Sequence, residues 1–427
     1  MTQGGPRDTI VALSSGPLPA AIAVIRSSGP AALAASAAIA GTPPRPRRAS
    51  LRTLRDPASG SVIDRGLVVV FPGPNSATGE DIVEYQCHGS RAVVSALLSA
   101  LTAQPGVRTA EPGEFTRRAL GNGRIDLTQA EGLAELLEAE SETQRKSALL
   151  RAEGGLRHRI EHWRQQLLDL SAEAEVAIDY ADEEDGGQVF RPAARIEGLI
   201  AELDHLLEAP RVERIRDGVR VVVAGPPNAG KSSLVNALAG QERAIVTATA
   251  GTTRDLIEVP LTIGGVALSL VDSAGLRDSD DEVEQIGISL AERAIASADV
   301  LLWLGDPSER PDHPRALQIA AKADRVDGRE GHAVSALTGQ GVAELKTWIA
   351  LQSSKIVPVT EQPALTEREA DLLQECGASL QRLKTVGDPV TVAEELRLAR
   401  STLDRISGLS GVEGLLDTLF GRFCLGK

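Results

Sequence analysis

The residues best suited to carry chemistry in this chain form a complete phosphate loop near its middle. Residues 225–232 read Gly-Pro-Pro-Asn-Ala-Gly-Lys-Ser, the G-x-x-x-x-G-K-S pattern. In such a loop, backbone N–H groups and a helix N-terminus surround phosphate oxygens, the lysine neutralises the outer phosphates, and the hydroxyl holds magnesium. The apolar run 220–224 predicts a buried strand and 232–239 a helix. The motif therefore has the strand–loop–helix context that it requires, and a chance glycine-rich turn explains it poorly.

Further segments follow in the order found in guanine-nucleotide switch proteins. Residues 247–255 form a switch-like loop, in which Thr253 would complete the magnesium shell. The predicted strand 268–271 leads into Asp272, which would hold magnesium through water, and then to Gly275, whose amide would sense the γ-phosphate.

Two later segments match the loops that read the base. They are Lys322-Ala323-Asp324 and Ser335-Ala336-Leu337. A carboxylate such as that of Asp324 accepts hydrogen bonds from the N1–H and the 2-amino group of guanine, which adenine does not offer. GTP is therefore expected rather than ATP. The residues expected to contact GTP are Asn228, Ala229, Gly230, Lys231, Ser232, Ser233, Thr247, Ala248, Thr249, Ala250, Gly251, Thr252, Thr253, Asp272, Ser273, Ala274, Gly275, Lys322, Asp324, Ser335 and Ala336.

The nucleotide motifs depart from the usual pattern at two positions. Ala321 stands where an Asn usually precedes the lysine, so we expect weaker nucleotide affinity, with guanine preference kept through Asp324. Leu276 follows Gly275, where many GTPases carry a glutamine that orients water. Leucine cannot orient water, so hydrolysis needs another device.

The acidic segment 279–287 offers a candidate for that device. Glu284 could orient the nucleophile through a bridging water, although the charge pattern alone favours a solvated acidic loop that caps the next helix. The amide oxygen of Asn228 could help to hold a monovalent cation beside the phosphates, which would replace an arginine finger.

Bulk composition limits the protein class. The chain has 427 residues, enough for two to four domains, and its net charge of −14 argues against a free-standing nucleic-acid binder. Any RNA would then be held by a partner or by a local patch. The three cysteines show no metal-type spacing, and there is neither a secretory signal nor an apolar run that could span a bilayer. We therefore expect a cytoplasmic protein with no membrane partner.

The periodicity of apolar residues divides the chain into different regions. Residues 8–120 alternate short strands (9–13, 21–25, 66–71 and 82–85) with helices (31–40 and 90–103), which predicts a compact α+β unit. From about 125 and again after 355, apolar residues recur at steps of three and four, as in a helical bundle. The two helical regions favour a nucleotide domain inserted into a discontinuous helical domain. Three domains in series are the alternative.

The chain resembles the MnmE (TrmE) family of GTPases that modify the tRNA wobble uridine. The resemblance rests on the nucleotide motifs together with segments 75–89 and 111–131 and the terminal Cys-Leu-Gly-Lys, and it covers essentially the whole chain. It implies an N-terminal α+β folate-binding and dimerising domain (1–121), a helical domain in two parts (122–216 and 355–427), and an inserted P-loop GTPase domain (217–354).

The resemblance also implies ligands and partners. Potassium would be held by Asn228, Thr247, Thr249 and Thr252, magnesium by Ser232 and Thr253, and a tetrahydrofolate (5-formyl or methylene) by Arg26, Glu80, Arg124 and Lys427. Glu284 matches the catalytic glutamate of the family, and Cys424 is a candidate catalytic thiol. The homodimer would form a heterotetramer with a flavin-dependent subunit of the MnmG (GidA) type and act on tRNA.

Without the resemblance, the residues outside the nucleotide motifs have plainer interpretations. Arg26 and Arg124 would be surface charges or salt-bridge partners, and Cys424 a small buried apolar residue. Pro17 and Pro19 replace a glycine-rich turn of the family, which changes the contacts expected there. Two other functions remain open: an Era-like GTPase switch in RNA or ribosome assembly without group-transfer chemistry, and a regulatory dimerisation switch.

Overall fold

The computed structural model describes residues 8–179, 193–240, 257–272, 292–325, 330–358, 362–384, 388–410, 413–421, 423 and 426. The chain divides into two compact units, one of Met1–Ala134 with Asp404–Lys427 and one of Glu135–Leu403. None of the helices in these described ranges combines the length and apolar composition needed to cross a bilayer.

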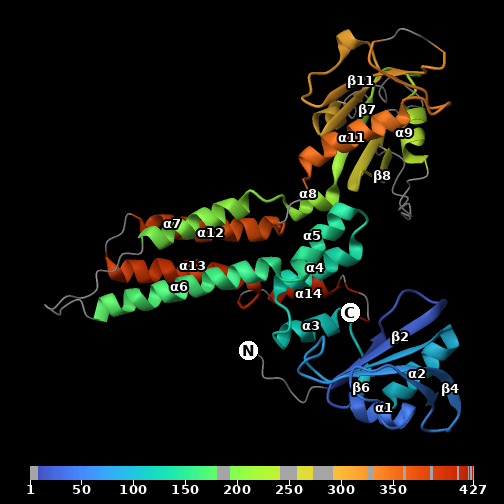
Figure 1. Ribbon diagram of the computed structural model, residues 1–427, viewed down its shortest axis with the longest axis vertical. Coiled ribbons are helices and arrows are strands. Elements are labelled where there is room, and N and C mark those ends of the chain that lie inside the picture. The colour runs from blue at the N-terminus through green and yellow to red at the C-terminus, as the bar shows by residue number, and fades with distance from the viewer. Residues whose placement is uncertain are drawn as a thin grey trace. The chain divides into compact units, whose positions relative to one another are not determined.

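The first unit is built on a six-stranded sheet in the order β3-β4-β5-β2-β1-β6 (Figure 1). Its strands are β1 (Thr9–Leu13), β2 (Ala20–Ser28), β3 (Ser50–Arg55), β4 (Val62–Phe71), β5 (Ile82–Gly89) and β6 (Val107–Thr109). All neighbours pair antiparallel except β1 and β6. The four strands predicted from the sequence are confirmed, whereas β3 and β6 are additional.

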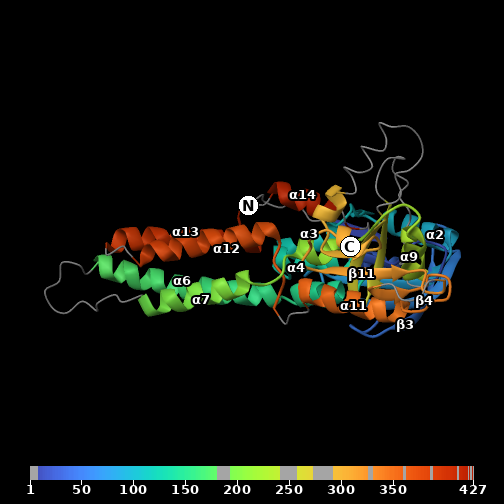
Figure 2. The same cartoon turned by 90° about the horizontal axis from the view of Figure 1, so that it is seen from above.

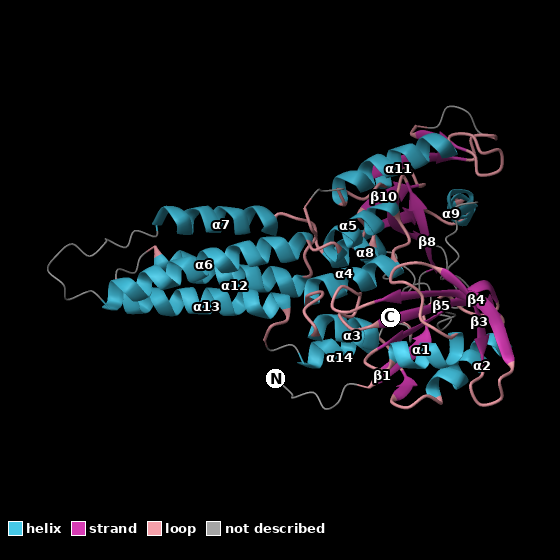
Figure 3. Cartoon of the chain, turned by 60° about the horizontal axis from the view of Figure 1, so that its bottom comes forward, coloured by secondary structure: helices cyan, strands magenta, loops and turns pink. Residues whose placement is uncertain are grey.

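The two faces of this sheet are covered differently. Helices α1 (Ala32–Ala40) and α2 (Arg91–Thr102) pack on one face, over side chains such as Val11, Ile25 and Tyr85 (Figure 3). Helix α3 (Glu114–Gly121) brings Phe115 onto Ile10 and Ala12, whose side chains point to the other face. Polar residues of β2 and β5 share that second face with α3.

The end of the chain returns to this unit. Helix α14 (Glu413–Gly421) lies against Gly113, where an added Cβ would come within 2.7 Å of the Phe420 carbonyl oxygen. Farther on, the Ser14 hydroxyl donates to the Gly426 carbonyl at 2.9 Å, and a Cβ at Gly426 would lie 2.0 Å from the Leu13 oxygen. The glycine of the terminal motif is therefore required by close backbone packing on β1.

The second unit contains a bundle of long helices that lie side by side (Figure 2). The bundle consists of α6 (Gly155–Asp179), α7 (Ala193–Leu207), α12 (Glu367–Leu383) and α13 (Pro389–Ser407) (Figure 1). The unit also contains α5 (Glu142–Ala152) and α8 (Val212–Asp217), and α4 (Leu127–Glu138) and α13 each span both units. On α6, the side chains from Leu156 to Ala174 that recur at steps of three and four are buried, as predicted. The Trp163 indole N–H donates to Glu202 on α7 at 2.7 Å.

A second six-stranded sheet, of order β12-β11-β10-β7-β9-β8, lies between α8 and α12 in the sequence. Its elements are β7 (Val219–Ala224), α9 (Lys231–Ala239), β8 (Ile257–Ile263), β9 (Val266–Asp272), β10 (Val300–Trp303), β11 (Ala316–Ala321), β12 (His332–Val334) and α11 (Val342–Ile356). All pairs are parallel except β8 with β9. Parallel strands place their carboxyl ends at one edge, where ligands bind in such sheets.

A buried ion pair joins the helices that precede and follow this second sheet. The guanidinium of Arg151 on α5 donates to both carboxylate oxygens of Glu369 on α12, at 2.7 and 3.1 Å, and both side chains are fully buried. Arg151 also donates to the Ala364 carbonyl at 2.7 Å and lies 3.2 Å from a carboxylate oxygen of Glu135. Burial alone would raise the pKa of Glu369, but the Arg151 charge and its hydrogen bonds hold that pKa below its ordinary value.

We predict that Glu369→Gln lowers the free energy of unfolding of the bundle by about 3 kcal/mol, because it leaves the buried Arg151 charge short of a partner. Urea denaturation followed by circular dichroism at 222 nm measures the change. Glu142→Gln is the matched control, since it removes an exposed partner of Arg145. Such a pair contributes little in water, so equal midpoints for the two variants would contradict the prediction.

Candidate functional site

The phosphate loop connects β7 to α9 and is shaped by its two glycines. Gly225 has φ +145°, and a Cβ there would meet Gly305 and Leu304 at 3.0 Å. Gly230, with φ +106°, is the residue before α9. The loop therefore folds close to the neighbouring backbone and presents the N-terminus of α9 at the carboxyl edge of the sheet.

The Lys231 side chain folds back onto its own loop. It is 7% exposed, and its ammonium donates to the Gly225 and Pro226 carbonyls, both at 2.8 Å. The Lys231 ammonium therefore lies on the inner side of the loop, where phosphate oxygens would also bind. Its charge is therefore positioned where a nucleoside triphosphate would bring the greatest negative charge.

Ser232 and Asp272, which are both expected to serve a magnesium ion, lie in contact. The Ser232 hydroxyl donates to a carboxylate oxygen of Asp272 at 2.6 Å, across 40 residues of sequence. Asp272 is 3% exposed at the end of β9, next to the loop strand β7. A hydroxyl and a carboxylate at a helix N-terminus form an all-oxygen donor set of the kind that magnesium prefers.

The base-reading segments meet at the ends of β11 and β12. The Ser335 hydroxyl, fully buried, donates to Asp324 at 2.6 Å. That hydrogen bond is the main cause that lowers the pKa of Asp324, and a backbone hydrogen bond and the charge of Arg325 add to it. The carboxylate therefore stays ionised and keeps a second oxygen for N–H donors, as guanine recognition needs.

The Ala321 departure is visible in the geometry around the loop. The Ala321 Cβ lies 3.9 Å from the position of a Cβ built on Gly230, so this side chain faces the phosphate loop without a polar group. Lys322, with φ +61°, instead reaches across to donate to the Asn228 carbonyl at 2.7 Å. One hydrogen bond, from Lys322 to Asn228, therefore joins the segment 322–324 to the phosphate loop. An asparagine at position 321 would add another.

Several residues expected in the site lie outside the described residues. They are Thr247, Ala248, Thr249, Ala250, Gly251, Thr252, Thr253, Ser273, Ala274, Gly275, Glu284, Cys424 and Lys427. Of the others, Ala229, Ser233 and Ala336 lie in or beside the loops just described. In the parts of the chain that the structure describes, no group of three His, Cys, Asp or Glu side chains could hold a metal ion.

Of the residues expected to bind folate, Arg26, Glu80 and Arg124 lie on or near the second face of the sheet in the first unit. Arg26 on β2 pairs with Glu84, directly opposite on β5, at 2.8 Å, and its guanidinium lies 5.8 Å from the centre of the Phe115 ring. Arg124 lies against Gly79, where a Cβ would be 3.3 Å from its Cγ. Glu80 therefore follows a residue in contact with Arg124.

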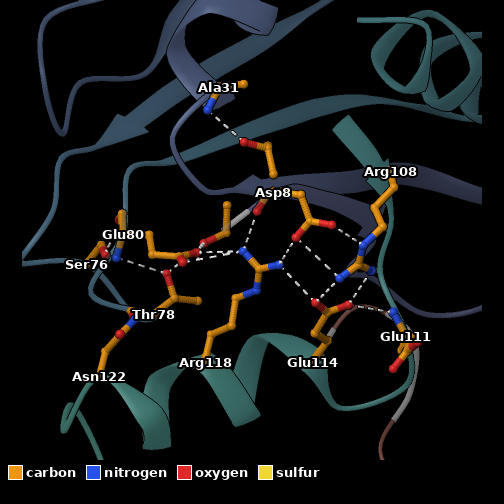
Figure 4. A network of polar contacts seen from close by, with 12 residues as sticks. Asp8, Ala31, Ser76, Thr78, Glu80, Arg108, Glu111, Glu114, Arg118 and Asn122 are labelled. Atoms are coloured by element: carbon orange, nitrogen blue, oxygen red, sulfur yellow. Dashed lines mark hydrogen bonds and ion pairs between the residues drawn. The ribbon is translucent and has the colours of Figure 1, made fainter. Parts of the chain in front are cut away.

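Glu80 is held by a network of charges that the sequence interpretation did not include (Figure 4). One of its oxygens accepts from the Ser28 hydroxyl at 2.8 Å and from Arg118 at 3.2 Å. Arg118 also donates to Glu114 and Asp8, which both pair with Arg108. The (i, i+4) spacing of Glu114 and Arg118 was the one local signal of this network, and its link to Glu80 spans 38 residues.

Comparisons with known proteins cover nearly the whole chain. The profile described as "GTP-binding protein TrmE N-terminus" matches residues 9–124, and "MnmE helical domain" matches residues 127–424. A "tRNA modification GTPase MnmE" of Rhizorhabdus wittichii is 49% identical, over 98% of this chain and 97% of that relative. The protein of the same name from Novosphingobium aromaticivorans is 47% identical, over 98% of this chain and 100% of that relative.

Among solved structures, Era from Aquifex aeolicus bound to GDP and aluminium fluoride is 22% identical, with a TM-score of 0.26. The similarity covers 38% of this chain and 66% of that one. A likeness at this level carries no argument about function.

We predict that Ala321→Asn tightens guanine-nucleotide binding about 5-fold, because one added hydrogen bond to the phosphate loop contributes about 1 kcal/mol. Titration of a fluorescent GDP analogue measures the dissociation constant. Ala343→Asn makes the same change at an exposed position of α11 and should leave binding unchanged. Equal affinities of the unmutated protein and Ala321→Asn would show that the missing polar group is of no consequence.

Proposed function

Because this chain belongs to the MnmE family of tRNA modification GTPases, we propose that it is a potassium-activated GTP hydrolase that modifies the wobble uridine of certain tRNAs. It acts as a homodimer with a flavin-dependent subunit of the MnmG type, and it uses a tetrahydrofolate one-carbon unit to build the aminomethyl or carboxymethylaminomethyl group at C5. We also propose the domain division 1–121, 122–216, 217–354 and 355–427.

One observation carries the hydrolase part of the proposal. Two pairs of residues, 40 and 11 positions apart in the sequence, meet at the carboxyl edge of the parallel strands of one sheet: Ser232 with Asp272 and Asp324 with Ser335, each at 2.6 Å. The first pair suits the magnesium and phosphates of a nucleotide, and the second suits the edge of guanine. The loop with Lys231 lies between β7 and α9, beside the first pair.

These residues divide the work of phosphoryl transfer. Lys231 exchanges its two loop carbonyls for phosphate oxygens and neutralises their charge. Ser232 and Asp272 would hold magnesium, which when bound offsets the charge on the transferred phosphoryl group. Glu284 orients the attacking nucleophile through a water in this proposal, because the leucine at position 276 cannot.

The potassium site of the proposal is centred on Asn228. This residue is exposed, has φ +58°, and offers its backbone carbonyl to Lys322. Within the described residues its side-chain amide makes no hydrogen bond, so the amide oxygen is available as a cation ligand. Thr247, Thr249 and Thr252 would supply further oxygens. A cation there would neutralise charge that develops during hydrolysis.

We predict that GTP turnover rises several-fold when sodium is replaced by potassium at constant ionic strength, and that Asn228→Ala abolishes the rise. Phosphate release measures the rate. Asn236→Ala is the matched control, since Asn236 is exposed farther along α9. Equal rates in the two salts for the unmutated protein would refute the cation site.

The folate part of the proposal rests on charge complementarity in the first unit. A tetrahydrofolate has a glutamate tail that suits arginine or lysine and a pterin edge that suits a carboxylate. Arg124 supplies the first chemistry and Glu80 the second, and Arg26 would join Arg124 by exchanging its partner Glu84 for the ligand. Lys427 would join them, because Gly426 packs on Leu13 and Ser14 of the same unit. Cys424 remains a proposed catalytic thiol.

We predict saturable binding of 5-formyl-tetrahydrofolate that is lost in Arg124→Ala, because the ligand's glutamate tail loses its cationic partner. Isothermal titration calorimetry measures it. Arg91→Ala removes an exposed arginine of the same unit whose side chain makes no hydrogen bond or ion pair within the described residues, and this variant should bind normally. If the unmutated protein hydrolyses GTP but binds no folate, the Era-like assembly switch or a regulatory dimerisation switch becomes the better explanation.

A further inference from the structure

The first unit carries a row of arginines at one edge of its sheet. No acidic residue occurs between Asp8 and Asp56, and five arginines fall within residues 45–55. They occupy the loop after α1 and the edge strand β3 (Figure 3). Arg65 joins them from β4, where it lies opposite Thr53. We name this set the arginine edge: Arg45, Arg47, Arg48, Arg52, Arg55 and Arg65.

These six arginines are not neutralised by the fold. Within the described residues, none of them lies within ion-pair distance of a carboxylate. Arg47, Arg52 and Arg55 donate only to backbone carbonyls. In the same unit, by contrast, Arg26 and the arginines of the Glu80 network are all paired.

The nearest carboxylates are committed elsewhere. Asp56 accepts from the Ala58 N–H and the Ser59 hydroxyl within its own turn. Asp64 accepts from the backbone N–H and the ring of His88. Both keep their negative charge, but six arginines against these two carboxylates leave the arginine edge locally cationic in a chain of net charge −14.

The arginine edge also has the form of an extended line. The loop runs alongside the end of β4, since the Arg47 N–H donates to the Val70 carbonyl at 2.8 Å, and β3 continues from Ser50 to Arg55. Arg52 and Arg55 are three strand steps, about 10 Å, apart, and the loop arginines 45, 47 and 48 extend the set beyond β3. Such a length faces several phosphates of one nucleic-acid strand, and guanidinium groups bind phosphate oxygens in a bidentate way.

We propose that the arginine edge binds the phosphate backbone of the substrate tRNA. The inference rests on the proposed function only in taking tRNA as the substrate, and it adds the surface that holds it. The residues involved lie in Met1–Ala134, whereas the nucleotide residues lie in Glu135–Leu403. Residues 41–65, all of them described, contain no aromatic side chain, and Phe71 of β4 lies under the Arg47 guanidinium at 5.7 Å. Contacts to phosphates, without base reading, are therefore expected.

The test compares the full-length protein with a triple variant, Arg45→Gln, Arg48→Gln and Arg65→Gln. These three exposed side chains make no hydrogen bond within the described residues, so the fold loses no internal contact. Fluorescence anisotropy with an unmodified tRNA transcript measures affinity over a series of salt concentrations. We expect about 10-fold weaker binding at 0.1 M salt, and a salt slope reduced by about 2 to 3, since each phosphate contact contributes about 0.7 to 0.9.

A matched control places lysine at the same three positions. It keeps the charge, so the salt slope should stay near that of the unmutated protein. GTP turnover and folate binding should be the same in all three proteins, which separates a failure of this inference from a failure of the proposed function. Unchanged affinity and slope in the glutamine variant would overturn the proposal.

Two other outcomes would also overturn it. Charged residues on an edge strand can serve only to prevent strand pairing between molecules. In that case, the glutamine variant would self-associate during size-exclusion chromatography and bind tRNA normally. If the edge binds a protein instead, the unmutated protein alone would show no salt-dependent affinity for tRNA.

Discussion

The buried charge of Arg151 is the constraint on which the second unit depends. A guanidinium with no exposure must be neutralised and hydrogen-bonded, or its burial is strongly unfavourable. Its partner Glu369 lies 218 residues away in sequence and also caps α12 through the Thr366 N–H at 2.8 Å. Nearby, the Val212 N–H donates to the Leu365 carbonyl at 2.9 Å. The chain thus enters and leaves the nucleotide sheet through two segments that are hydrogen-bonded to each other.

Helix α5, which carries Arg151, connects this ion pair to the nucleotide residues. At the start of α5, the Thr143 N–H and hydroxyl donate to the Gly265 carbonyl at 3.1 and 3.0 Å, in the turn between β8 and β9. Strand β9 then ends at Asp272, the partner of Ser232. Burial raises the pKa of Glu135 to about 7, although the nearby Arg151 charge lowers it. Arg151 also pairs with Glu369. Helix α5 therefore bridges a buried polar network and a strand of the nucleotide site.

Local patterns were enough to predict the parts that depend on local sequence. The phosphate loop follows from its spacing, and α6 follows from apolar steps that place Leu156, Ile160 and Trp163 on one buried face. The Ser232–Asp272 contact was predictable because both motifs end at the same edge of a sheet. Arg118 with Glu80 and Arg151 with Glu369 were not, since charge patterns do not reveal pairing across tens or hundreds of residues. Strand β3 was not predicted because only Leu54 of its six residues is buried, which leaves no apolar pattern in its sequence.

Net charge also says little about what the protein binds, because it does not reveal which charges are paired across the fold. A sum of −14 says nothing of which charges are already neutralised by the fold. Arg108 and Arg118 are committed to Asp8, Glu114 and Glu80, so their charges are hardly available to a partner. The arginine edge holds six of the 45 lysines and arginines, and five of its six side chains are exposed and make no ion pair within the described residues. Whether an acidic protein can bind an anionic ligand therefore depends on where its unpaired cationic side chains lie, rather than on its net charge.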